Sequence, residues 1–136
     1  HPQHRRQRQM CIRDRYIKDE FLIIDAAMND LLRPALYNAK HDVWSLTESY
    51  SNNKKWTIVG PVCESSDIIA KDHVINADEG DILAIKTAGA YGFVMASNYN
   101  SRMRPPEVLV NGNKFNIIRA RESFDDLIKN EVKISD

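Results

Sequence analysis

The sequence has little of several residue types, and each scarcity excludes a class of protein. Its 136 residues include only two cysteines, five glycines and five prolines, too few for a disulfide scaffold or a collagen-like chain. The net charge is zero and 43% of the residues are hydrophobic, which is atypical of a disordered chain. No apolar run approaches the roughly 18 residues of a membrane-spanning helix. We therefore predict one soluble globular domain without a membrane anchor.

The cysteines and histidines indicate neither a disulfide nor a metal site. Cys11 lies in a polar, basic segment and Cys63 in a turn-like segment, and no secretory signal is recognisable, so we expect free thiols in a reducing, cytoplasmic location. The four histidines are scattered, and none lies at zinc-ligand spacing from a cysteine. We predict no metal site.

Positive charge is concentrated at the start of the sequence. Residues 1–15 contain five arginines and a single acidic residue, Asp14. Such an arm could bind nucleic acid or an acidic partner, but no aromatic residue is interleaved for base stacking. We therefore favour a disordered or foreign arm over residues 1–15, expect no nucleic-acid binding, and place the folded domain at residues 16–136.

The pattern from residue 16 onward predicts a mainly β fold. Strands are expected at residues 16–25, 56–62, 68–75 and 81–87, with an extended segment at 35–46. The sequence Asn-Gly-Asn predicts a hairpin between residues 107–110 and 115–121. Short helices are expected through residues 28–32, where Pro34 would end the helix, at 91–96, and after Ser123 to about 132. Together these elements predict an antiparallel β-barrel or sandwich with two or three short helices. A complete (β/α)₈ barrel occupies about 250 residues and does not fit.

The segment at residues 60–67, GPVCESSD, is the first candidate site. A loop at the end of a strand is a common place for reactive groups. The carboxylates near Cys63 disfavour its thiolate, so this cysteine suits a proton donor better than a nucleophile. The alternative is a buried structural cysteine followed by a polar turn.

Three other segments could contact a ligand. Tyr91 stands between two glycines in AGAYGF, where its hydroxyl could reach a phosphate or carboxylate, although a packing turn would have the same composition. Arg33 and Tyr37 share one face of an extended segment and could clamp a carboxylate; a surface arginine is the alternative. The polar run at residues 97–102 is most simply a loop.

Four motifs in order carry a family resemblance: MNDLLRPALY, VGPVCESSD, AGAYGFVMASNYNSRMRPPEVLV and IIRARESFDDLI. They resemble the carboxyl-terminal part of the diaminopimelate decarboxylases, within the fold type III, alanine-racemase-like enzymes that depend on pyridoxal phosphate. The resemblance spans residues 16–132. It implies a homodimeric lyase with a (β/α)₈ barrel followed by a β-barrel domain, of which residues 16–136 would be the latter. The implied reaction converts meso-2,6-diaminopimelate to L-lysine and CO₂ in lysine biosynthesis.

The resemblance also implies roles for individual residues. Cys63 would donate the proton that replaces CO₂, and Glu64 would bind the distal amino group of the substrate, both across the dimer. Arg33 and Tyr37 would hold the distal carboxylate, and Tyr91 would contact the substrate and the cofactor. Related ornithine and arginine decarboxylases remain an alternative, but the ornithine enzymes resemble this motif with Asp where Glu64 stands.

The chain departs from the family pattern in one large respect. No lysine here lies in a motif resembling the Schiff-base site, and the barrel that carries it is missing. We therefore expect a fragment that is inactive alone. A second interpretation is a non-enzymatic β-module that binds a partner through its basic arm.

Overall fold

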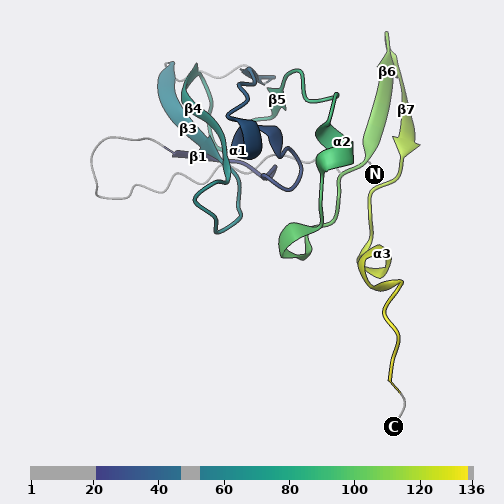
Figure 1. Ribbon diagram of the computed structural model, residues 1–136. Coiled ribbons are helices and arrows are strands. Elements are labelled where there is room, and N and C mark those ends of the chain that lie inside the picture. The colour runs from purple at the N-terminus through teal and green to yellow at the C-terminus, as the bar shows by residue number, and fades with distance from the viewer. Residues whose placement is uncertain (1–20, 47–52, 135–136) are drawn as a thin grey trace.

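The computed structural model describes residues 21–46 and 53–134, and over this part the fold is mainly β with three short helices. The predicted fold class is confirmed, although no closed barrel forms within the described ranges. The predictions for residues 1–15, Cys11 included, lie outside these ranges. Figure 1 shows the elements in order: β1 (Phe21–Ile23), α1 (Arg33–Tyr37), β2 (Val43–Ser45), β3 (Lys54–Val59), β4 (Ile68–Ile75), β5 (Leu83–Ile85), α2 (Gly92–Met95), a 3₁₀ turn (Tyr99–Ser101), β6 (Glu107–Asn111), β7 (Lys114–Arg119) and α3 (Phe124–Ile128).

The central sheet has the strand order β1, β3, β4. Strand β3 is antiparallel to β4, as predicted, but β1 runs parallel to β3, with Leu22 opposite Ile58. Parallel strands need a long crossover connection. Here the chain between β1 and β3 supplies it, because it contains α1 and β2. A purely antiparallel sheet was therefore the wrong expectation for this one pair.

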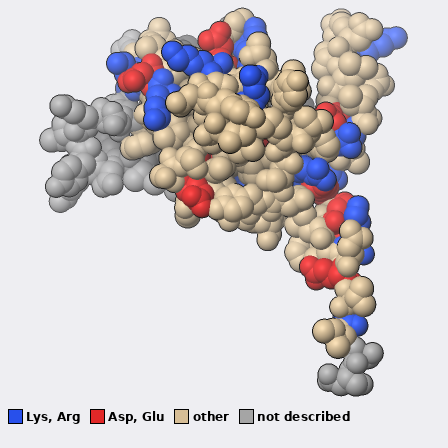
Figure 2. All heavy atoms as spheres, in the orientation of Figure 1, with Lys and Arg blue, Asp and Glu red and all other residues tan. Residues whose placement is uncertain are grey.

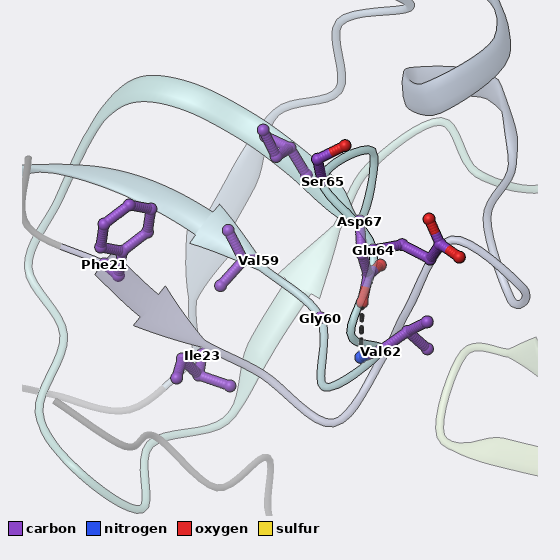
Figure 3. A pocket seen from close by; sticks show the side chains of 9 residues that line it. Phe21, Ile23, Val59, Gly60, Val62, Glu64, Ser65 and Asp67 are labelled. Carbon is purple, nitrogen blue, oxygen red and sulfur yellow. Dashed lines mark hydrogen bonds between the residues drawn. The ribbon is translucent and has the colours of Figure 1, made fainter. Parts of the chain in front are cut away.

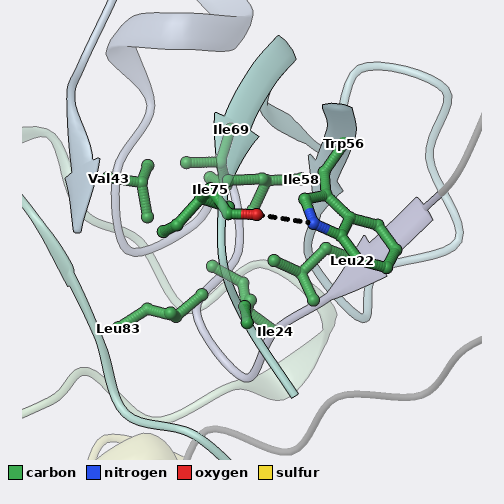
Figure 4. Packing of buried hydrophobic residues seen from close by; sticks show 9 residues of the cluster. Leu22, Ile24, Val43, Trp56, Ile58, Ile69, Ile75 and Leu83 are labelled. Atoms are coloured by element: carbon green, nitrogen blue, oxygen red, sulfur yellow. Dashed lines mark hydrogen bonds between the residues drawn. The ribbon is translucent and has the colours of Figure 1, made fainter. Parts of the chain in front are cut away.

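The core lies between this sheet and the antiparallel pair β2 and β5. Strand β3 alternates in burial, so that Trp56 and Ile58 point into the core. The indole nitrogen of Trp56 donates a hydrogen bond to the Ile75 carbonyl at 3.1 Å (Figure 4). A ring nitrogen of His73 lies 2.8 Å from the Val43 carbonyl and ties β4 to β2. The labelled members of the core in Figure 4 are Leu22, Ile24, Val43, Trp56, Ile58, Ile69, Ile75 and Leu83.

The first helix begins where the sequence predicted a helix to end. Residues 28–30 form a turn, and α1 spans Arg33–Tyr37 with Pro34 in its first turn. Proline is compatible with that position because its fixed φ is helical and its missing N–H would have no helical partner. The helix ends at Asn38, which adopts a left-handed φ of 55°. The expected helix at 28–32 and the extended conformation of residues 35–37 are therefore wrong.

The last third of the chain follows its local sequence signals closely. The predicted hairpin is present as β6 and β7, joined by a turn in which Gly112 has a φ of 57°. Ser123 caps α3, as the sequence indicated, and the structure adds a reciprocal capping box with Asp126. Helix α3 ends at Ile128 rather than near residue 132.

The hairpin stands apart from the central sheet in Figure 1, and its apolar side chains are exposed on both faces. Figure 2 shows its surface as mainly uncharged. The guanidinium of Arg119 lies 3.9 Å from the centre of the Phe93 ring, which connects the hairpin to α2. Exposed apolar patches of this kind favour association. The side chains concerned are Val108, Leu109, Val110, Phe115, Ile117 and Ile118.

We expect the isolated chain to self-associate through this hairpin. The double variant Val108→Glu/Phe115→Lys places opposite charges on one face of the ribbon and should move the light-scattering mass toward that of the monomer. Val74→Lys is the matched control, since Val74 on β4 is 60% exposed, and should leave association unchanged. A dispersed monomer in the parent chain would contradict the prediction.

Candidate functional site

The loop at residues 60–67 is built around the buried carboxylate of Asp67. This residue is 2% exposed. One of its oxygens accepts a hydrogen bond from the Val62 amide at 2.8 Å (Figure 3), and the other accepts one from the Met28 amide at 2.6 Å. The Asp67 carbonyl accepts another from the Gly60 amide at 3.0 Å. Asp67 therefore closes the loop and fastens it to the turn after β1.

Gly60 allows the loop to approach this turn. A Cβ atom at residue 60 would lie 2.3 Å from an Asp67 carboxylate oxygen and 2.7 Å from the Ala27 Cα atom. No side chain fits in that space, so glycine is required here for close packing.

Cys63 and Glu64 lie in the middle of this loop. Both are exposed, and Cys63 is a free thiol. The alternative of a buried structural cysteine is therefore excluded. The loop's internal hydrogen bonds hold the backbone beneath two accessible side chains, an arrangement suited to presenting an acid and a carboxylate to a ligand.

The turn at residues 25–31 connects this loop to the polar run at 97–102. On one side it receives Asp67 through the Met28 amide. On the other, the Ser97 amide donates to the Asn29 carbonyl at 2.9 Å, and the Arg102 guanidinium donates to the Asp25 carbonyl at 2.6 Å. Two segments distant in sequence thus share one support.

The polar run contributes Tyr99, whose hydroxyl donates a short hydrogen bond to Glu64. This bond raises the pKa of Tyr99 above its usual value, because the phenolate would face the carboxylate. The segment was expected to be a plain loop; it forms a 3₁₀ turn in which Asn100 has a left-handed φ of 56°. Its contact with Glu64 was not foreseen.

The other predicted ligand residues lie on helices. Arg33 and Tyr37 are four residues apart on α1, so they share a face on a helix instead of the expected extended segment. Tyr91 precedes α2 with a left-handed φ of 60° and is 63% exposed. Among the described residues, no direct hydrogen bond or ion pair joins these three side chains to Cys63 or Glu64.

An open cavity of about 470 Å³ lies beside the same loop (Figure 3). Its wall is mostly apolar, with Glu64 and Asp67 as the acidic members. Cys63 does not line it, so the thiol and this cavity are separate features. The residues around it are Phe21, Ile23, Val59, Gly60, Val62, Glu64, Ser65, Asp67 and Ile68. Over the described ranges, no cluster of side chains could hold a metal ion and no helix is long and apolar enough to cross a membrane.

Glu122 fixes the polar run from the side of the hairpin. Its carboxylate accepts hydrogen bonds from the Arg104 side chain at 2.6 Å and from the Asn98 amide group at 2.7 Å. The bond from Arg104 is the main reason that the pKa of Glu122 falls from 4.5 to about 2. The Asn98 amide group also donates to the Arg102 carbonyl at 3.0 Å. Glu122 thus orders the segment that carries Tyr99.

We expect Gly60→Ala to destabilise the fold by ~1–3 kcal/mol, because the new Cβ displaces Asp67 or the turn behind it. Chemical denaturation measures the change. Gly89→Ala is the matched control, since a Cβ at residue 89 meets no atom within 4 Å, and should be nearly neutral. Equal effects of the two variants would contradict the packing role of Gly60.

Glu122 should make stability depend on acidity. Because its pKa is lower in the folded chain, ionised Glu122 stabilises the fold above about pH 4.5, and this contribution is lost as the pH falls toward about 2. Urea unfolding over that range should show a smaller acid-induced loss for Glu122→Gln than for the parent. Glu131→Gln, the control, should follow the parent. If the free energy of unfolding changed with pH equally in all three proteins, the contribution of Glu122 would be refuted.

Comparison with known proteins identifies the domain. Residues 4–89 match the family model described as the pyridoxal-dependent decarboxylase, C-terminal sheet domain. The chain is 49% identical over 112 residues to the diaminopimelate decarboxylase of Neisseria meningitidis serogroup B, which covers 82% of this chain and 27% of that enzyme.

Two solved structures share the fold. A protein from Aquifex aeolicus superposes with a TM-score of 0.87 at 40% identity, covering 94% of this chain and 32% of that one. Diaminopimelate decarboxylase from Helicobacter pylori, complexed with L-lysine, gives a TM-score of 0.81 at 42% identity, covering 92% and 30%. The chain thus spans about 27% of the length of the Neisseria meningitidis enzyme. It belongs to the pyridoxal-dependent decarboxylase family, whose C-terminal sheet domain it carries.

Proposed function

We propose that this chain is the C-terminal part of a diaminopimelate decarboxylase, which converts meso-2,6-diaminopimelate to L-lysine and CO₂. The supporting observation is the 49% identity to the Neisseria meningitidis enzyme, together with an exposed Cys63-Glu64 pair on a loop held by Asp67. The Helicobacter pylori relative is complexed with L-lysine, which is the product of the proposed reaction.

Cys63 is the proposed proton donor. When CO₂ leaves, the bonding electron pair stays on the α-carbon, and that carbon must gain a proton. The exposed thiol of Cys63 can supply it: the S–H bond breaks, a C–H bond forms, and the thiolate is then reprotonated by solvent. A positioned acid of this kind is general acid catalysis.

Glu64, Arg33 and Tyr37 are the proposed substrate-binding residues. The distal end of the substrate carries an ammonium and a carboxylate. A carboxylate at Glu64 suits the ammonium, while the guanidinium and phenol on one face of α1 suit the carboxylate. Tyr37 is 64% exposed and accessible for that contact. Two opposite charges at a fixed separation would select a substrate with both groups.

The available side chains fit a cofactor held mainly by another part of the protein. The thiol of Cys63 and the phenol of Tyr91 face outward, so they can contact a cofactor but do not enclose one. Two of the described lysines already contact neighbouring side chains of this chain: Lys86 lies over the Trp44 ring, and Lys55 pairs with Asp72. Pyridoxal phosphate, when bound, supplies an electron sink for the reaction. Tyr91 is the proposed contact to it from this chain.

The proposal includes a homodimer in the cytoplasm. In this arrangement Cys63 and Glu64 serve the cofactor of the partner subunit. Outward-facing catalytic side chains support the idea, because a site completed by a second chain needs them at the surface.

A chimera tests the function. The matching C-terminal region of the Neisseria meningitidis decarboxylase is replaced by this chain, and release of CO₂ and lysine is measured with pyridoxal phosphate present. We expect activity in the chimera and none in the isolated chain. Cys63→Ala should lower kcat by about 10²–10⁴-fold, and Glu64→Gln should chiefly raise KM.

Ser66→Ala is the control on the same loop, since its hydroxyl contacts the Met28 sulfur at 3.5 Å and not Glu64, and it should retain parental activity. A folded, dimeric chimera without activity would reject the function. Full activity in Cys63→Ala would reject the role of the thiol alone.

A further inference from the structure

The hydrogen bond from Tyr99 to Glu64 joins two residues that lie 35 positions apart. Glu64 is exposed at the tip of its loop. An exposed glutamate side chain samples many rotamers, and holding it in one costs conformational entropy. The phenol provides a fixed partner that selects one position of the carboxylate.

Tyr99 can act as a fixed partner because its own segment is anchored. The Arg102 guanidinium reaches the Asp25 carbonyl at 2.6 Å, and the Ser97 amide reaches the Asn29 carbonyl at 2.9 Å. These contacts lie on the turn that also receives Asp67 through the Met28 amide. Tyr99, which donates the bond, and Glu64, which accepts it, therefore lie on two segments that are both held by the turn at residues 25–31.

The chemical nature of the partner matters for the charge on Glu64. A lysine or arginine in that place would form an ion pair and neutralise the carboxylate. A neutral phenol donates one hydrogen bond and leaves the negative charge in place. Among the described residues Glu64 forms no ion pair. Its second carboxylate oxygen can therefore receive a cation.

We propose that Tyr99 is a positioning residue that orients Glu64 for the distal ammonium group of the substrate. This inference rests on the proposed function. Tyr99 occupies one oxygen of Glu64 and leaves the other for the ligand. Its effect passes through Glu64, so it should influence the binding of the substrate's distal end more than the proton transfer at Cys63.

The kinetic test uses the active chimera with Tyr99→Phe, Glu64→Gln and the double variant. Loss of the phenol hydroxyl should raise KM for meso-2,6-diaminopimelate by about 5–10-fold, the scale of one typical intramolecular hydrogen bond, with kcat within about twofold of the parent. In the Glu64→Gln background the same change should have no further effect on KM. Ser66→Ala remains the control on the loop.

A second measurement does not depend on activity. In the isolated chain, the phenolate absorbance is followed as the pH rises. Tyr99→Phe should remove one phenol whose pKa is raised, and Glu64→Gln should lower the midpoint of the Tyr99 phenol, because the carboxylate is what disfavours its ionisation. No change in either variant would overturn the bond itself.

The outcomes separate the two hypotheses. The positioning role is overturned, and the function left intact, if the chimera is active and the effects of Tyr99→Phe and Glu64→Gln on KM are additive. The same conclusion follows if Tyr99→Phe lowers only kcat and stability and leaves KM unchanged. A folded chimera without activity overturns the function, and with it the role toward the substrate, whatever the titration gives.

Discussion

The buried carboxylate of Asp67 is the interaction on which the candidate site depends. A buried charge is costly unless hydrogen bonds replace its hydration. Here two backbone amides, from Val62 and Met28, do so at 2.8 and 2.6 Å. One amide belongs to the loop and the other to the turn after β1. The same contact therefore satisfies the carboxylate, shapes the loop and fixes its place on the sheet.

The turn at residues 25–31 extends that order to the rest of the site. It accepts the loop on one side and the polar run on the other, through Met28, Asn29 and Asp25. Neither the loop at residues 60–67 nor the polar run at 97–102 is long enough to form a stable structure alone. Each instead takes its position from the sheet through one shared turn, which is how a small domain can place exposed groups accurately.

The sequence predicted those features that depend on neighbouring residues. The hairpin followed from Asn-Gly-Asn, the cap of α3 from Ser123, and the loop after β3 from a strand that runs into the turn GPVCESSD. Features that depend on distant contacts were missed. Pro34 was read as a helix end because its position relative to the turn was unknown, and the parallel pairing of β1 requires knowledge of the crossover.

The same distinction applies to the site. Cys63 and Glu64 were predicted as site residues from their motif, whereas Asp67 looked like an ordinary turn residue and Tyr99 like part of a loop. Their importance comes from partners 39 and 35 residues away, which no local pattern reveals. An aspartate just before a strand, at the end of a glycine-initiated loop, is the one signal that could have drawn attention to Asp67.

These separations also bear on the order in which the chain folds. A hairpin such as β6 and β7, closed by a two-residue turn, forms in about 1–10 μs because its partners are already near one another. Contacts between distant residues must first overcome the entropy of closing a long loop. The hairpin therefore forms before the loop at residues 60–67 is held by its distant contacts, and newly made chains expose the apolar side chains of the hairpin before that loop is in place.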